Sequence, residues 1–375
     1  METLVRHYQK ENNPLVKSSI VKMIGFHESE PISMDSGIRE SFISDLCKDY
    51  EFHPDPGLHA SILWLLNNKW DEKKRLMTIE NRLAKNQNVI NGGAVWRLNS
   101  QGQTLVLIKP GLSFEMGGIP EDSEKLVQNG KDLEQQHEVM ISHGFELSQK
   151  EVTLEEFQRF KPSFQPIGKV NPTLRRDVAV GGVSWFDAIG YCQWLTEKEG
   201  IPVGEHCFPA SYEIRAGINI PANFIQKKGY RLPTEEEWEI AARAGNVMPY
   251  PCGMTADHID HFAITWRNGR ERLWPGGSRL PNTWGFFDMS GNVLEWTMDP
   301  FDIYDPIRAQ EMKKMREQAA MLNVSGNVQM SIRGGSFNNS PTAARNSARL
   351  ALAANMNNVS MGFRICRTVT PAKTK

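Results

Sequence analysis

The sequence changes its pattern near residue 96, and this change constrains the fold more than any other feature. Before it, residues 13–25 and 55–67 each begin with Asn-Pro or Asp-Pro and carry apolar residues at helical spacing. After it, short β-branched runs such as residues 103–108 end at Pro-Gly turns. We therefore predict a small all-α helical module over residues 1–85, an α+β domain with much irregular structure over residues 86–370, and a frayed tail over residues 371–375.

The N-terminal helices have two interpretations. The two segments that begin with Asn-Pro and Asp-Pro start about 40 residues apart, a spacing that resembles the helices of HEAT-type repeats. Stable arrays of this kind normally need three or more repeats, so a short array would have to pack against the rest of the chain. The module is therefore either a HEAT-like repeat or a few helices that cover the next domain.

Composition and charge bear on several functional classes. The net charge of −1 gives no electrostatic reason to expect nucleic acid as a partner, because such proteins carry a clearly basic face. No apolar run approaches the roughly 18 residues that span a bilayer, and the first residues lack the apolar core of a secretory signal. The five cysteines form no Cys-x-x-Cys pair, which argues against a disulfide framework or a zinc ribbon. We expect a cytoplasmic protein with no membrane partner.

A set of motifs follows in a fixed order along the second region. They are Met-Gly at 116–117, Val-Ser-Trp-Phe-Asp-Ala at 183–188, Arg-Leu-Pro-Thr-Glu-Glu-Glu-Trp at 231–238, Gly-Asn-Val-Leu-Glu-Trp at 291–296, Arg-Gly-Gly-Ser at 333–336 and Gly-Phe-Arg at 362–364. Together they resemble the formylglycine-generating enzyme (sulfatase-modifying factor) family over residues 103–368. The resemblance implies a C-type-lectin-like formylglycine-generating-enzyme fold, of the α+β class, behind the helical module.

The resemblance breaks down at the family's catalytic centre. Catalytic members carry two copper-binding cysteines shortly after Arg-Gly-Gly-Ser, and the corresponding positions here are Asn339 and Ala344. Soft thiolates hold Cu(I), whereas an amide or a methyl group does not. We therefore expect no copper and no formylglycine generation, and we favour a non-catalytic protein. An enzyme with different chemistry in the old cleft stays open; near Asn339 the sequence offers it only Arg345 and Arg349 as charged groups.

The resemblance also implies a structural calcium site within residues 288–295. Asp288 and Glu295 would supply side-chain oxygens, and Met289, Gly291 and Val293 would supply backbone carbonyls. Calcium takes six to eight oxygen ligands, which suits carboxylates that alternate with carbonyls in a tight loop. The alternative is a tight turn in which Glu295 accepts hydrogen bonds from backbone amides.

The segment from residue 337 to residue 358 is rich in small and polar residues. In the family, the equivalent region lines the former active-site face. Asn and Arg side chains exposed on a rigid scaffold suit the recognition of a protein surface, although a solvent-facing loop without a partner would have the same composition. The candidate binding residues are Asn338, Asn339, Arg345, Asn346, Arg349, Asn355 and Asn357.

These observations predict a non-catalytic binding or scaffold protein that recognises a protein partner. Similar domains accompany bacterial regulatory and defence systems, CRISPR-associated ones included, and this context is an analogy of fold. Besides the enzyme with different chemistry, a second alternative stays open. The variable proteins of diversity-generating retroelements use this fold to present mutated positions, and the Asn-rich segment resembles theirs.

Overall fold

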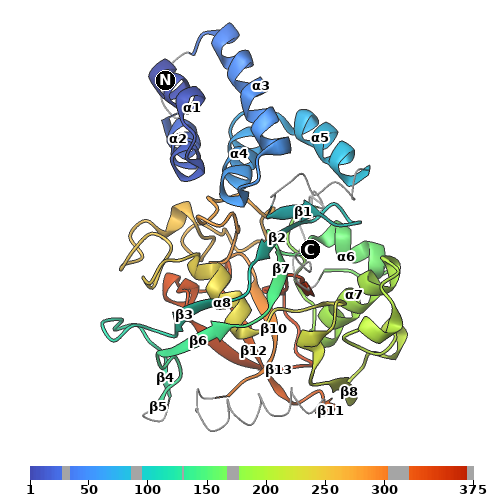
Figure 1. Ribbon diagram of the computed structural model, residues 1–375. Coiled ribbons are helices and arrows are strands. Elements are labelled where there is room, and N and C mark those ends of the chain that lie inside the picture. Colours follow the sequence, from blue (N-terminus) through green and yellow to red (C-terminus); the bar gives the residue numbers. More distant parts are fainter. Residues whose placement is uncertain (28–33, 86–94, 129–130, 167–176, 303–320, 370–375) are drawn as a thin grey trace.

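The computed structural model describes residues 1–27, 34–85, 95–128, 131–166, 177–302 and 321–369 (Figure 1). Within the described residues five helices precede the first strand, which confirms a helical region before the sheets: α1 (Glu2–Lys10), α2 (Pro14–His27), α3 (Ser36–Phe52), α4 (Pro56–Asn68) and α5 (Lys73–Lys85). The predicted tail over residues 371–375 lies outside the described residues. The predicted Pro residues begin α2 and α4, and the side chain of Asp55 caps α4 by accepting from the Leu58 amide. No helix within the described ranges is long and apolar enough to cross a membrane.

The helical module shares its apolar core with the following domain. Leu280 and Phe287 belong to the same cluster of buried side chains as the helices. Two glycines allow a close approach of the backbones, because a Cβ on Gly57 would lie 2.2 Å from the carbonyl oxygen of Thr283. A Cβ on Gly285 would likewise lie 2.2 Å from the carbonyl oxygen of Pro56. These contacts are those of helices that pack on the next domain.

The second region contains two larger sheets. The first has the order β1-β2-β7-β15-β9 and is antiparallel throughout. The second has the order β13-β12-β10-β14, and only its β10–β14 pair is parallel. Their strands are β1 (Trp96–Leu98), β2 (Thr104–Ile108), β7 (Gly144–Ser148), β9 (Tyr230–Arg231), β10 (Leu294–Pro300), β12 (Gln329–Arg333), β13 (Arg349–Ala353), β14 (Met361–Gly362) and β15 (Cys366–Val369).

Three two-stranded ribbons complete the strands. They pair β3 (Leu112–Met116) with β6 (His137–Ile141), β4 (Val127–Gln128) with β5 (Lys131–Asp132), and β8 (Ile218–Pro221) with β11 (Met321–Val324). In Figure 1 the helical module lies above the sheets, and the β3–β6 ribbon reaches outward beneath it. Much of the remaining chain is irregular, so the α+β class with a preceding helical module is confirmed.

Three helices support the sheets, namely α6 (Leu154–Phe160), α7 (Trp185–Lys198) and α8 (Glu235–Arg243). Each begins with a capping box, in which Thr153, Ser184 or Thr234 exchanges hydrogen bonds with the acidic residue three positions later. Glu237 of α8 therefore has a structural role, because its side chain completes the capping box. Among the described residues, five short 3-10 helices lie in the connections after α7: η1 (Val203–Glu205), η2 (Ser211–Glu213), η3 (Phe224–Gln226), η4 (Ile259–His261) and η5 (Pro341–Ala344).

Candidate functional site

The segment after β12 folds back on itself at two glycines. Gly334 and Gly335 have φ angles of 89° and 69°. A Cβ on Gly335 would lie 2.8 Å from the carbonyl oxygen of Ala343, so this position requires glycine. The chain then passes through η5 and continues into β13. The fold-back leaves Asn338 exposed and Asn339 half-buried, whereas Ala344 faces the interior.

The two positions that the resemblance aligns with the catalytic cysteines hold an amide and a methyl group. The side-chain oxygen of Asn339 accepts a hydrogen bond of 2.7 Å from the Ser336 hydroxyl. The methyl group of Ala344 is 0% exposed. Cys366 is buried beside Arg231, 3.4 Å from its guanidinium, and burial raises the pKa of its thiol well above the usual value. A buried thiol with a raised pKa is a poor nucleophile and a poor metal ligand.

The expectation that Arg345, Asn346 and Arg349 are exposed is wrong. All three side chains are buried. Arg345 donates to Asp122 at 2.8 Å and to Glu134 at 2.6 Å. A guanidinium that lies this far from solvent requires carboxylate partners, and both come from the long connection between β3 and β6.

The other two residues are held in the same way. Arg349 donates to Glu235 at 2.8 Å, at the first turn of α8. The Asn346 amide donates to the carbonyl oxygen of Met248 at 3.0 Å. These side chains join the fold-back to the rest of the domain. Whether they also bind a partner stays a prediction, but the exposed surface that the sequence suggested for them does not exist.

The remaining candidates, Asn338, Asn355 and Asn357, are exposed. Asn338 belongs to the fold-back, where its backbone amide donates to the Ser336 hydroxyl at 3.3 Å. Asn355 and Asn357 lie in the turn between β13 and β14, and the Asn355 amide donates to the carbonyl oxygen of Gly326. The structure therefore divides the predicted surface between two turns with different neighbours.

Sequence reasoning missed Trp266, which lies beside the fold-back. Its backbone amide donates to the carbonyl oxygen of Asn339 at 3.0 Å, and its side chain is 66% exposed. Tryptophan is one of the residue types that are enriched in protein-binding hot spots. The sequence signal was a Trp-Arg-Asn-Gly turn at residues 266–269, but turn residues alone do not reveal which side chain faces solvent.

A pocket of about 190 Å³ lies on the inner side of the fold-back. Its polar lining includes Arg333, Arg345, Arg349 and Glu134, and each guanidinium donates to a carboxylate: Arg333 to Glu239, Arg345 to Glu134 and Arg349 to Glu235. Glu124 and Lys125 also line the pocket; the Glu124 carboxylate accepts from the Tyr250 hydroxyl, and Lys125 donates to Asp132 at 2.9 Å. Paired ions of this kind stabilise the domain. Within the described residues, no group of three or more His, Cys, Asp or Glu side chains is arranged to hold a metal ion.

The predicted calcium loop is tight and buried. Asp288 and Asn292 have φ angles of 55° and 59°, and a Cβ on Gly291 would lie 2.2 Å from the carbonyl oxygen of Ile264. Met289 and Val293 are buried. One oxygen of Asp288 accepts from the Gly277 amide at 2.6 Å, and its other oxygen has no hydrogen-bond partner. Burial raises the pKa of Asp288 to about 6. This carboxylate therefore fits a cation ligand.

Glu295 does not fit the role that the sequence suggested. Its two oxygens accept from Arg364 at 2.6 Å each, and one of them also accepts from the Trp238 indole at 2.8 Å. The alternative, in which Glu295 accepts from backbone amides, is wrong as well, because the donors to Glu295 are the side chains of Arg364 and Trp238. The buried carboxylate that sequence reasoning missed is Glu151, which accepts from Asn292 at 2.8 Å and from the Val293 amide at 3.3 Å.

Comparisons with known proteins agree with this geometry. The family model described as the Sulfatase-modifying factor enzyme 1-like domain matches residues 94–369. The chain is similar to a formylglycine-generating enzyme of Mycobacterium tuberculosis, with 32% identity over 32% of this chain and 41% of that protein. It is also similar to the inactive C-alpha-formylglycine-generating enzyme 2 of Mus musculus, with 27% identity over 39% of this chain and 50% of that protein. The chain thus spans half or less of these two relatives.

A solved structure supports the fold. The Treponema denticola variable protein 1 superposes with a TM-score of 0.54 and 22% identity, over 71% of this chain and 95% of that chain. At this level of identity the similarity concerns the fold alone.

Proposed function

The chain belongs to the sulfatase-modifying factor enzyme 1-like family, and on this premise we propose that it is a non-catalytic member that recognises a protein partner. The observation that carries the proposal is the pair of positions 339 and 344. The side-chain oxygen of Asn339 accepts a hydrogen bond from the Ser336 hydroxyl, and Ala344 is buried. Oxidation of a substrate thiol through Cu(I) needs soft sulfur ligands at these positions.

The surface that remains there suits recognition. We define the recognition face as Trp266, Asn338 and Asn339, which are joined by the hydrogen bond from the Trp266 amide to the Asn339 carbonyl. An aromatic anchor beside amide groups on a hydrogen-bonded loop loses little conformational entropy on binding. The proposal includes a partner from a bacterial regulatory or defence system. It also includes a cytoplasmic location, which suits five cysteines that are all free thiols.

The proposal also includes a structural cation at the 288–295 loop. Asp288 would hold it, because its unpartnered oxygen lies among buried carboxylates whose charges raise the pKa of Glu151 further. Such an ion would neutralise this charge and would support the loop. A role as a variable ligand-binding protein stays an alternative prediction, and a template repeat beside the gene would support it.

Photo-crosslinking in the native cells tests the proposal. A photoreactive amino acid at position 338 should capture one protein in stoichiometric amounts. The same amino acid at position 212 is the control, because Tyr212 is 85% exposed in η2, which the hydrogen bond of 2.8 Å from Ser211 to Glu197 ties to α7. Capture from position 338 that Trp266→Ala abolishes supports the proposal. Equal capture from both positions, or none from position 338, contradicts it.

A further inference from the structure

The loop that follows Trp266 carries exposed cations without carboxylate partners. Arg267, Arg270 and Arg272 are all exposed. Among the residues that the structure describes, none of the three forms an ion pair. Arg267 donates to the carbonyl oxygen of Ala256, and the Arg272 guanidinium lies 4.4 Å from the centre of the Trp274 ring. Of the nine exposed arginines among the described residues, four form an ion pair, and three of the five that do not lie in this one loop.

The loop is held firmly in this shape. The Gly269 amide donates to the Thr265 carbonyl at 2.7 Å, and the Trp274 indole donates to the Gly269 carbonyl at 2.8 Å. A Cβ on Gly269 would lie 2.8 Å from the Phe337 carbonyl oxygen, so the loop packs directly on the residue before Asn338. The loop that carries the cations therefore adjoins the recognition face.

The backbone of the loop is strained where the cations are presented. Arg270 and Glu271 both have φ angles of 53°. Two consecutive side-chain-bearing residues in the left-handed region cost on the order of 1–2 kcal/mol each, and such strain is concentrated at functional sites. Arg270 is exposed in this conformation.

We propose that the occupant of this surface is an acidic segment of the partner protein, seated on Trp266 with its carboxylates on Arg267, Arg270 and Arg272. This inference rests on the proposed function and specifies the chemistry of the partner. A guanidinium presents paired donors that match a carboxylate, and an aromatic side chain provides the apolar anchor. The only acidic residue between Arg267 and Arg272 is Glu271, and the carboxylate of Asp260 accepts from Asn268 of the loop at 3.3 Å. Three arginines against these two carboxylates leave a local excess of one positive charge.

A protein segment suits this surface better than a single-stranded nucleic acid does. Nucleic-acid binding without sequence preference uses a basic groove with successive aromatic platforms. Here Trp266 is the one exposed aromatic ring of the loop, because Trp274 is covered by Arg272. The net charge of the chain is −1, which gives no wider basic track.

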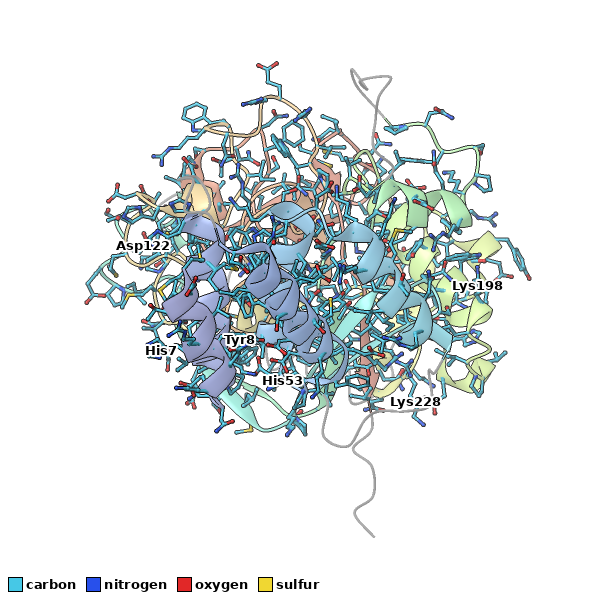
Figure 2. The ribbon with its side chains drawn as sticks, turned by 90° about the horizontal axis from the view of Figure 1, so that it is seen from above. His7, Tyr8, His53, Asp122, Lys198 and Lys228 are labelled. Atoms are coloured by element: carbon cyan, nitrogen blue, oxygen red, sulfur yellow. The ribbon has the colours of Figure 1, made fainter. Side chains whose placement is uncertain are left out.

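Selection of displayed random peptides on the full-length protein tests the inference. We expect the enriched peptides to be rich in Asp and Glu, and to bind more weakly as salt rises from about 50 mM to about 500 mM. Arg267→Glu/Arg270→Glu should weaken their binding by about 10-fold. Lys198→Glu/Lys228→Glu makes the same change of charge and should leave binding unchanged. Figure 2 places Lys198 and Lys228 on the side opposite to Asp122, the ion-pair partner of Arg345.

The outcomes separate this inference from the proposed function. Peptides without acidic bias, or equal binding by Arg267→Glu/Arg270→Glu, would overturn the inference. Tight binding of oligothymidine that is lost in the same variant would overturn it in favour of nucleic acid. If a partner is captured from position 338 and Arg267→Glu/Arg270→Glu still binds it, the proposed function stands and the inference fails. Unchanged melting temperatures of both double variants exclude misfolding as the cause.

Discussion

The imidazole of His59 stacks on the indole of Trp96, with ring centres 3.8 Å apart. This contact joins α4 of the helical module to β1 of the first sheet. The imidazole also stacks on the ring of Tyr50, and the Nδ1 of His59 lies 2.9 Å from the carbonyl oxygen of Tyr50. Burial lowers the pKa of His59 to about 3, against an ordinary value of 6.5, and nearby Lys150 lowers it further. The neutral imidazole is therefore part of the junction.

Acid should weaken the fold through His59. Because its pKa is lower in the folded protein, the unfolded chain takes up the proton first as pH falls through 6.5. The stability that the neutral ring contributes is thus present above pH 6.5 and is lost between pH 6.5 and about 3, by about 1.4 kcal/mol per pH unit. We expect the free energy of unfolding in urea, measured from pH 8 to pH 5, to fall less steeply with falling pH in His59→Phe than in the wild type. His27→Phe, at an exposed site, should keep the wild-type slope.

The close contact between the helical module and the domain should not tolerate a methyl group. Gly57→Ala places a Cβ 2.2 Å from the Thr283 carbonyl oxygen, so the backbones must separate. We expect a loss of about 1–3 kcal/mol in the free energy of unfolding. Gly204→Ala is the control, since nothing lies within 4 Å of its added Cβ. Equal unfolding curves for the two variants would show that the interface is looser than the structure indicates.

Arg345 and Asn338 should respond differently to truncation, although the sequence suggested the same role for both. Arg345→Ala leaves the buried carboxylates of Asp122 and Glu134 without their partner, which should cost about 3–5 kcal/mol. Asn338→Ala changes an exposed side chain and should leave stability within about 0.5 kcal/mol. Thermal and urea unfolding measure both. A stable Arg345→Ala variant would mean that this guanidinium is not structural.

Calcium should stabilise the protein through Asp288. The pKa of this carboxyl is raised to about 6, from 3.8, so its charge destabilises the fold once pH exceeds 3.8, and fully above 6. A bound cation removes this penalty, and at a hundredfold excess over Kd it adds about 2.7 kcal/mol. At pH 8, calcium should therefore raise the melting temperature of the wild type. Asp288→Asn should melt higher than the wild type without calcium and should not respond to it. If neither calcium nor a chelator changes the melting temperature of the wild type, the protein has no calcium site at Asp288.

Local signals predicted much of the fold. Pro56, with Asp55 before it, predicts the start of α4, and Thr234 with Glu237 predicts the start of α8, because caps act within a few residues. The pairing of Arg345 with Glu134, and that of Glu295 with Arg364, joins residues far apart in the sequence. Such pairs depend on the packed fold, which no local pattern encodes. For this reason analysis of the sequence alone assigned arginines that are buried in the structure to a binding surface.

Trp266 and Glu151 were missed for a related reason. Each lies outside the motifs that resemble the family, and each gains its role from a neighbour brought by the fold. Trp266 meets Asn339, and Glu151 meets Asn292. The family resemblance correctly indicated the domain. That positions 339 and 344 correspond to the catalytic cysteines stays a prediction.

The central claim is that thiol chemistry has been lost at positions 339 and 344. The most direct test supplies the protein with Cu(I), oxygen, a thiol reductant that provides the two further electrons, and a cysteine-containing sulfatase peptide, and follows aldehyde formation by mass spectrometry. A catalytically active formylglycine-generating enzyme serves as the positive control. We predict no aldehyde and no Cu(I) bound at this site. Aldehyde formed with turnover, and abolished by Asn339→Ala, would contradict the account.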